Sequence, residues 1–285
     1  MTVINTNVAS LYAQSAITTN SRQMTSTMQQ LSTGKRINGA SDDAAGIAIS
    51  AKLTSQIKGL AQALRNANDA ISMIQTAEGA TDTITNMLQR MRELTIQSGN
   101  ASYSNDDRTA MANEFTALAS EIDRIADTTK WNGFPVLNAT AGTSGKFMYD
   151  VDSGSGALGK IDITISSFKR GSTHGITVGT GTQVITSTMT SSTAQTLITH
   201  IDTSIKFVNT QRATMGATIN RLQYTLDNLT NIETNTQASR SRIEDTDYSS
   251  ATAQLSKNNI IQQAATAMLS QANQQPQIVL QLLKQ

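Results

Sequence analysis

Apolar residues recur in alternating steps of four and three along much of this chain, and this spacing restricts the fold more than any other feature. Such steps line one seam of a helix that coils around a neighbouring helix. The first run contains Leu53, Ile57, Leu60, Leu64, Ala67, Ile71 and Ile74. Its phase is interrupted at Glu78 and Gly79 and resumes at Ile84. A continuous helix over residues 41–97 would be about 80 Å long at ~1.5 Å per residue.

Two later segments repeat the spacing. The first contains Met111, Phe115, Leu118, Ile122 and Ile125, and the second contains Ile201, Ile205, Val208, Met215, Ile219, Leu222, Leu226 and Leu229. Arg212 also falls on the second seam, and a single polar residue there often fixes the register of the helices. Three such helices can bury their seams against one another. We therefore predict a coiled-coil core that includes Leu53, Ile57, Leu60, Leu64, Ile71, Ile74, Ile219, Leu222 and Leu226.

The composition supports narrow seams between long helices. Aromatic residues make up 4% of the chain, and there are 2 prolines. Large aromatic residues usually fill wide globular cores, whereas Leu, Ile, Met and Ala suit helix-to-helix seams. The predicted fold is mainly α, a long coiled-coil helical rod formed by both chain ends, with a small β-rich insertion in the middle.

The middle of the chain has a different pattern. Asn132-Gly133 is a two-residue hairpin signal, with Trp131 before it and Phe134 after it. Residues 142–193 are rich in Gly, Ser and Thr and contain alternating β-branched runs. We predict a hairpin at Asn132-Gly133, followed by a small β-rich insertion with loops that is exposed at one end of the rod.

Both termini are almost free of charge. Residues 1–34 contain Arg22 as their one charged side chain, and residues 258–283 contain none. Both ends still carry helical apolar stripes, formed by Ile4, Val8, Leu11, Ile261, Ala265, Met268 and Ala272. Because exposed helices normally carry Lys and Glu, these stripes are predicted to be polymerisation seams covered by other chains. Alone, the ends would then be disordered. The alternative is that they pair with each other within one chain.

The charge balance argues against several classes of function. Lys and Arg total 22 against 21 Asp and Glu, whereas a general nucleic-acid binder needs a basic excess. No segment approaches the ~20 apolar residues of a membrane span, and residues 1–30 lack a cleavable signal peptide. Cys is absent, and His174 and His200 form no zinc motif. No catalytic residue, metal or cofactor is therefore predicted. The pairs Asp42-Asp43 and Asp106-Asp107 suit helix starts instead.

Several segments resemble motifs of bacterial flagellins. Residues 31–46 (Leu-Ser-Thr-Gly-Lys-Arg-Ile-Asn-Gly-Ala-Ser-Asp-Asp-Ala-Ala-Gly) resemble the N-terminal signature of that family. Residues 74–79 and 89–94 are similar to motifs of its first long helix, and residues 270–283 resemble its C-terminus. The likeness extends in order through most of the chain outside the 142–193 insertion.

The resemblance implies a non-enzymatic structural subunit that is secreted and polymerises into the extracellular filament of the bacterial flagellum, which serves motility. It implies five segments. These are an inner-core helix and linker (1–40), a coiled-coil part with the hairpin (41–141), a variable surface insertion (142–193), the last coiled-coil helix (194–240) and a C-terminal inner-core helix (241–285). The implied partners are copies of the same chain, the flagellar export apparatus, an export chaperone, the filament cap and hook-filament junction proteins, with no nucleic acid and no membrane.

The resemblance also points to a possible receptor face. Positions through which an animal Toll-like innate immune receptor recognises the family are matched by Gln89, Arg90, Leu94, Gln97 and Glu114. The alternative is that these are simply polar groups on a helix face that becomes buried between subunits. Two other functions stay open as competitors. One is a hook-filament junction protein, and the other is an adhesin or enzyme carried by the 142–193 insertion.

Overall fold

The structure is a computed structural model that describes residues 6–138, 146–150, 160–171, 176–179 and 183–282. Within them the chain forms five helices and two short two-stranded sheets. It divides into two compact units, of which one contains residues 1–57 and 234–285 and the other contains residues 58–233. The prediction of a mainly α fold with a small β content is confirmed. The predicted segment boundaries remain predictions.

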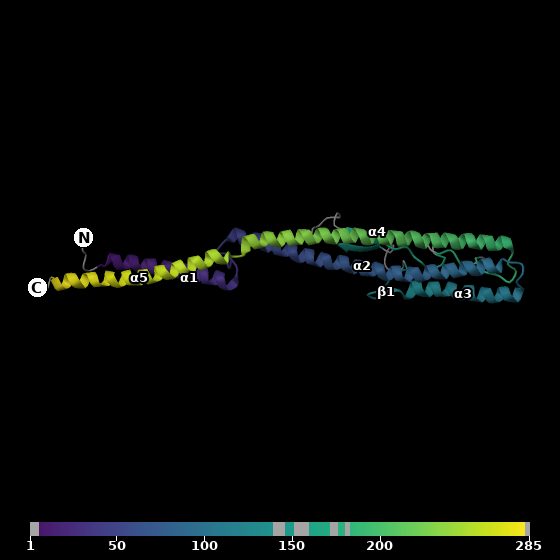
Figure 1. Ribbon diagram of the computed structural model, residues 1–285, viewed down its shortest axis with the longest axis horizontal. Helices are drawn as coiled ribbons and strands as arrows, with labels where there is room; N and C mark the ends of the chain where they lie inside the picture. The colour runs from purple at the N-terminus through teal and green to yellow at the C-terminus, as the bar shows by residue number, and fades with distance from the viewer. Residues whose placement is uncertain (1–5, 139–145, 151–159, 172–175, 180–182, 283–285) are drawn as a thin grey trace. The chain divides into compact units, whose positions relative to one another are not determined.

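The 58–233 unit is built around helices α2 (Ala44–Ser98), α3 (Asn105–Thr128) and α4 (Ser191–Glu244) (Figure 1). One uninterrupted seam of steps of four and three is buried on α2, formed by Ala63, Ala67, Ala70, Ile74, Ala77, Thr81, Ile84, Leu88 and Met91. The predicted phase break at Glu78 and Gly79 is therefore wrong. Ala77 and Thr81 occupy the seam positions there, and a search for large apolar residues alone does not detect them.

The predicted core residues occupy two environments. Ile74 and Leu222 are fully buried. Leu60, Leu64, Ile71, Ile219 and Leu226 are partly buried and pack against the margin of the core. Leu53 and Ile57 are also partly buried, but they lie in the other unit. The centre of the α2 seam is instead rich in alanine, because small side chains let neighbouring helices approach closely while the leucines cover the flanks.

Helix α3 begins as its sequence predicts. Ser104 is the N-cap: its hydroxyl accepts a hydrogen bond from the Asp107 backbone N–H, and the Asp107 carboxylate accepts one from the Ser104 N–H. The Ser104 hydroxyl also donates to the Asp107 carboxylate, and this hydrogen bond, followed by the one from the Ser104 N–H, lowers the pKa of the Asp107 carboxyl. After α3 comes the predicted hairpin, in which β1 (Lys130–Trp131) pairs with β2 (Phe134–Pro135). Both Asn132 and Gly133 have positive φ, as the tight turn requires.

The insertion contains the antiparallel pair β3 (Lys146–Asp150) and β4 (Lys160–Thr164). Between residues 161 and 189, the apolar side chains that the structure describes are buried or partly buried, so the predicted exposure is wrong for them. The buried members are Ile161, Ile163, Ile165, Phe168, Ile176, Val178, Ile185 and Met189, and they belong to the same apolar cluster as the three helices. The Phe168 ring lies 5.5 Å from that of Phe207 on α4, between ring centroids. The insertion thus completes the core, because the helices alone leave apolar surface uncovered.

A half-buried ion pair fastens the insertion to α3. The guanidinium of Arg170 donates through Nε and Nη2 to Asp123 Oδ2 at 2.9 and 2.7 Å, and through Nη1 to the Gly179 carbonyl at 3.0 Å. The Arg170 backbone N–H donates to Asp123 Oδ1. Asp123 therefore satisfies three donors of the insertion at one place.

We expect Asp123→Ala to lower the free energy of unfolding by about 1–3 kcal/mol, because it leaves the Arg170 donors without their acceptor. Asp202→Ala is the matched control, since Asp202 pairs with Arg92 at the surface, where ion pairs contribute under about 1 kcal/mol. Urea unfolding followed by circular dichroism measures both. Equal losses in the two variants would contradict the role assigned to Asp123.

Two surface ion pairs join α2 and α4 in a single register. Asp82 of α2 pairs with Arg212 of α4 at 3.2 Å, and Arg92 of α2 pairs with Asp202 of α4 at 2.7 Å. Arg92 lies ten residues after Asp82, and Asp202 lies ten residues before Arg212, so both pairs fit one antiparallel alignment. Arg212 is half-buried at the edge of the seam. Its predicted contribution to register is consistent with this pairing.

In the other unit, α1 (Val8–Thr33) and α5 (Tyr248–Leu282) lie side by side and antiparallel (Figure 1). Asn7 caps the start of α1 by accepting from the Ser10 N–H. Gly34 ends α1 with φ +72°, a left-handed conformation that favours glycine. In the structure the two ends pair with each other within one chain. The predicted disorder of the free ends stays a prediction.

Candidate assembly surface

The seam between α1 and α5 mixes small and polar residues with a few large apolar ones. The seam positions of α1 are Ser10, Ala13, Ile17, Asn20, Met24, Thr27 and Leu31, and those of α5 are Ala251, Leu255, Asn258, Gln262, Ala265, Leu269 and Ala272, with Gln30 and Gln254 partly buried beside them. Both sets follow strict steps of three and four. The two helices are in contact along the seam. Sequence reasoning missed this seam, since Asn20, Thr27 and Asn258 break its apolar pattern.

The predicted polymerisation residues fall into three groups. Ala265 and Ala272 lie on the α5 seam that faces α1, so for them the prediction of a free seam needs correction. Val8, Leu11, Ile261 and Met268 are exposed, with 66% of the Met268 surface accessible. Ile4 lies outside the described residues. The exposed four are the ones that remain available to another chain.

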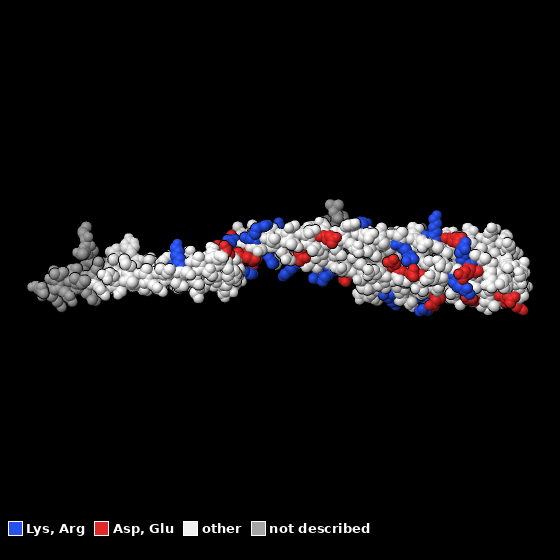
Figure 2. Space-filling view, in the orientation of Figure 1, with Lys and Arg blue, Asp and Glu red and all other residues white. Residues whose placement is uncertain are grey.

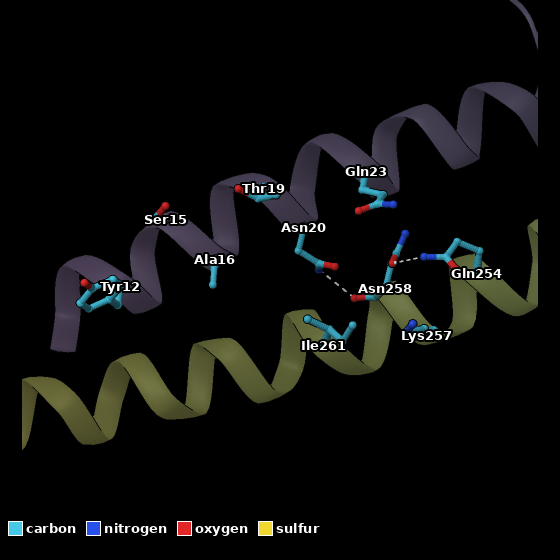
Figure 3. A pocket seen from close by; sticks show the side chains of 10 residues that line it. All are labelled: Tyr12, Ser15, Ala16, Thr19, Asn20, Gln23, Gln254, Lys257, Asn258 and Ile261. Carbon is cyan, nitrogen blue, oxygen red and sulfur yellow. Dashed lines mark hydrogen bonds between the residues drawn. The ribbon is translucent and has the colours of Figure 1, made fainter. Parts of the chain in front are cut away.

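A shallow groove of about 550 Å³ runs between the two helices (Figure 3). Its lining residues are Tyr12, Ser15, Ala16, Thr19, Asn20, Gln23, Gln254, Lys257, Asn258 and Ile261. Tyr12 is 75% exposed. Asn258 is buried, and its side-chain oxygen accepts from Gln254, whereas its Nδ2 has no hydrogen-bond partner among the described residues. The groove is thus polar but almost uncharged.

Charge is distributed unevenly over the chain. Figure 2 shows mixed positive and negative side chains over the 58–233 unit and very few over α1 and α5. The single charged residue within α1 is Arg22, and the single one within α5 is Lys257. Exposed apolar side chains with no surrounding charge form a surface suited to burial against another protein.

A cluster around Glu244 holds the segment that follows α1. The Glu244 carboxylate pairs with Lys35 Nζ and accepts from Ser50 Oγ of α2, both at 2.5 Å. Two backbone hydrogen bonds run beside it, from Arg36 N to Glu244 O at 2.7 Å and from Thr246 N to Gly34 O at 3.0 Å. The hydrogen bond from Lys35, followed by that from Ser50, lowers the pKa of the Glu244 carboxyl. No sequence motif marked this cluster in advance.

We expect the Glu244 cluster to stabilise its unit above the ordinary carboxyl pKa and to lose this contribution in acid. A carboxyl whose folded pKa is lowered stabilises the fold while it is ionised, and the contribution disappears as the pH falls through the folded pKa. Glu244→Gln should therefore lower the melting temperature at pH 7. The difference in melting temperature between the variant and the wild-type chain should become smaller once the pH is below 4.5, the ordinary pKa of a glutamate carboxyl. Differential scanning calorimetry of filaments checks this, and an equal difference at pH 7 and pH 3 would contradict it.

The predicted receptor residues do not all lie on one surface. Gln89, Arg90, Gln97 and Glu114 are exposed, whereas Leu94 is only 2% exposed and belongs to the core, which corrects its assignment. Arg90 Nε donates to Glu114 Oε1 on α3 at 2.9 Å. This hydrogen bond raises the pKa of the Arg90 guanidinium. Arg90 and Glu114 thus form a fixed charged pair across two helices.

Other kinds of site find little support. Within the described residues, no group of His, Asp and Glu side chains is arranged to hold a metal ion. His174 lies outside them, and His200 is a half-buried residue of α4. In the part of the chain that the structure describes, no helix is long and apolar enough to cross a membrane.

The fold and surface define a class of protein: a mainly helical chain whose paired terminal helices expose apolar side chains and carry almost no charge. Sequence comparison gives the family. Residues 4–141 match the bacterial flagellin N-terminal helical region, and residues 198–283 match the bacterial flagellin C-terminal helical region. The chain belongs to the bacterial flagellin family, whose members are structural proteins, and it is a subunit of a flagellar filament.

Individual relatives agree with this. The chain is 43% identical over 282 residues to a flagellin of Halalkalibacterium halodurans, covering 99% of this chain and 100% of the relative. It is 36% identical over 284 residues to a flagellin of Listeria innocua, covering 98% and 99%. A solved Vibrio parahaemolyticus protein, provisionally named as flagellar hook-associated, is 14% identical with a TM-score of 0.58, covering 72% and 100%. That likeness concerns the fold alone, so the competing junction-protein function gains nothing from it.

Proposed function

We propose that this filament subunit assembles by coupled folding and association. In the free chain α1 and α5 are disordered, and they become ordered as further copies cover their exposed faces. The observation that carries the proposal is the surface of this helix pair, which exposes Val8, Leu11, Ile261 and Met268 and bears almost no charge. Contacts between copies that do not close into a ring then generate a helical polymer.

The energetics of the pair support this proposal. Ordering α1 and α5 fixes 26 and 35 residues, each at about 1–2 kcal/mol of backbone entropy. Their mutual seam contains Ala, Ser, Thr, Asn and Gln at many positions, so it buries little apolar area. Helices of this kind are marginal without packing on further faces. Other copies of the chain supply that packing in the filament.

Hydrogen exchange tests the proposal. In dilute monomer we expect the amides of residues 8–33 and 248–274 to exchange as in an unfolded chain, and in filaments to be protected by about 100-fold or more. Amides near Ile84 and Leu88 in α2 are the internal control and should be protected in both samples. Strong protection of both terminal helices in dilute monomer would refute coupled folding.

We further propose that the chain leaves the cell unfolded through the flagellar export apparatus, with the help of an export chaperone. Outside the cell, it joins the growing filament, which begins at the hook-filament junction proteins and ends at the filament cap. A chain without cysteine forms no crosslinks that would block passage. Inactivating the flagellar export apparatus should retain the protein inside the cell. If export then continues through the general secretory route, the proposal is wrong.

We also propose that the exposed face formed by Gln89, Arg90, Gln97 and Glu114 is read by an animal Toll-like receptor when the subunit is monomeric. The carrying observation is the exposed Arg90–Glu114 pair, which places a guanidinium and a carboxylate at fixed positions on adjacent helices. Arginine in such a setting is a frequent anchor of protein interfaces.

Receptor signalling by purified monomer tests this second proposal. Arg90→Ala should weaken signalling by about tenfold or more, as expected when an interface anchor is truncated. Arg124→Ala is the matched control, because Arg124 also forms an exposed pair, with Glu121 on α3. A monomer that does not signal, or equal activity of the two variants, would remove the claim.

A further inference from the structure

We infer that Asn20 fixes the register in which α1 pairs with α5, and that this buried amide is a positioning residue of the filament subunit. The inference rests on the proposed ordering of both helices in the filament. Asn20 Nδ2 donates across the seam to the Asn258 backbone oxygen at 2.9 Å (Figure 3). It also donates to Gln262 Oε1 at 3.0 Å. Asn20 is 7% exposed, so its amide has little access to water.

The apolar part of the seam does not define one register. Both helices repeat their buried positions every seven residues, so sliding one helix by seven residues places seam residue against seam residue again. Most apolar members are Ala, Leu, Ile or Met, and no ion pair crosses this seam among the residues described. Packing by itself therefore distinguishes poorly between the two alignments.

The lengths of the helices permit such a slip in one direction. α5 has 35 residues and α1 has 26, and Asn7 at the start of α1 lies opposite Ala272. α5 continues beyond that point to Leu282. Sliding α1 by seven residues toward the end of α5, about 10 Å at ~1.5 Å per residue, keeps every α1 turn opposite an α5 turn.

The amide contacts do distinguish the alignments. After the slip, Asn20 would face Ala265 and Leu269 in place of Asn258 and Gln262. In either alignment, Asn20 can donate to a backbone carbonyl of α5. In the slipped alignment, however, neither Ala265 nor Leu269 offers a side-chain acceptor in place of Gln262. A buried donor that loses its acceptor is unfavourable. Thr27, the other buried polar residue of the α1 seam, bonds to the Gln23 carbonyl of its own helix, so it has no preference for either register.

A second feature could set the register without Asn20. The two backbone hydrogen bonds beside Glu244 tie the end of α1 to the start of α5. A slip of about 10 Å would break them, although the ten residues 34–43, which reach about 33 Å when extended, could span the change. The experiment must therefore separate the amide from this bridge.

Cysteine crosslinking reads the register directly, since the chain has no cysteine of its own. Ala13→Cys with Ala265→Cys reports the observed register. Residue 13 lies seven positions before Asn20 and residue 265 lies seven positions after Asn258, so the antiparallel alignment that places Asn20 opposite Asn258 also places 13 opposite 265. Ala13→Cys with Ala272→Cys reports the slipped one, and a disulfide forms only where Cα atoms come within about 7 Å. Each variant is incorporated as a minority into wild-type filaments, so it need not assemble alone.

Asn20→Leu should raise the ratio of slipped to native crosslink about fivefold or more, the effect of one buried hydrogen bond. Asn20→Leu with Thr27→Asn moves the amide by one heptad, opposite Asn258 in the slipped alignment, and should make the slipped crosslink the major product. Thr27→Val is the matched control and should keep the native crosslink alone. Filaments in which all three variants give only the native crosslink would overturn the inference and assign the register to the bridge. Wild-type protein that forms no filaments would instead refute the proposed function.

Discussion

Deleting residues 258–285 is expected to abolish polymerisation while leaving the 58–233 unit folded. The deletion removes the α5 seam from Asn258 onward and leaves only Ala251 and Leu255 of it, so most of α1 loses its partner. It also removes Ile261 and Met268, two of the exposed apolar residues available to neighbouring chains. A filament that depends on the helix pair has no remaining route to form.

Sedimentation and electron microscopy measure this outcome, with filament yield expected to fall below detection. The control is the thermal unfolding of the 58–233 unit, whose buried residues all lie before the deletion. An unchanged transition by circular dichroism shows that the truncated chain is folded and that loss of assembly is specific. Normal filaments from the truncated protein would invalidate the assembly role of the terminal pair.

Phe168→Ala is expected to lower the free energy of unfolding of the 58–233 unit by about 3–5 kcal/mol, the usual range for emptying a buried phenylalanine site. Phe168 is fully buried, although it lies in a segment whose composition predicts exposed loops. Its ring packs against Phe207 of α4, and its N–H donates to the Leu137 carbonyl at 2.9 Å. The loss would therefore come from a core shared by the insertion and the helices.

Phe134→Ala is the matched control. Phe134 belongs to the β1–β2 hairpin and is 59% exposed, so its removal should change stability by under about 0.5 kcal/mol. Urea unfolding at several protein concentrations, with filament formation prevented, gives both values. A small effect at Phe168 would mean that the insertion is only a surface appendage, as the sequence predicts.

The periodic spacing of the sequence was sufficient to identify the helices, because steps of three and four have one structural reading over long segments. The spacing did not show that Ala63 and Ala70 lie on the buried seam of α2, or that Thr81 continues this seam. Small and hydroxyl-bearing residues carry little periodic signal, yet they are the ones that fit where two backbones approach closely. The same reason hid Asn20 and Asn258 between α1 and α5.

By itself, the sequence determined that this protein is helical and that its ends are poor in charge, because local spacing and composition decide those properties. Its motifs at residues 31–46 and 270–283 also indicated the flagellin family, by resemblance. Only the tertiary structure decided which faces are free. In the tertiary structure, Ala265 and Ala272 face α1, and Leu94 and Phe168 are buried in the core. Burial depends on which neighbour covers a residue, and neighbours far apart in the sequence meet only when the chain is folded.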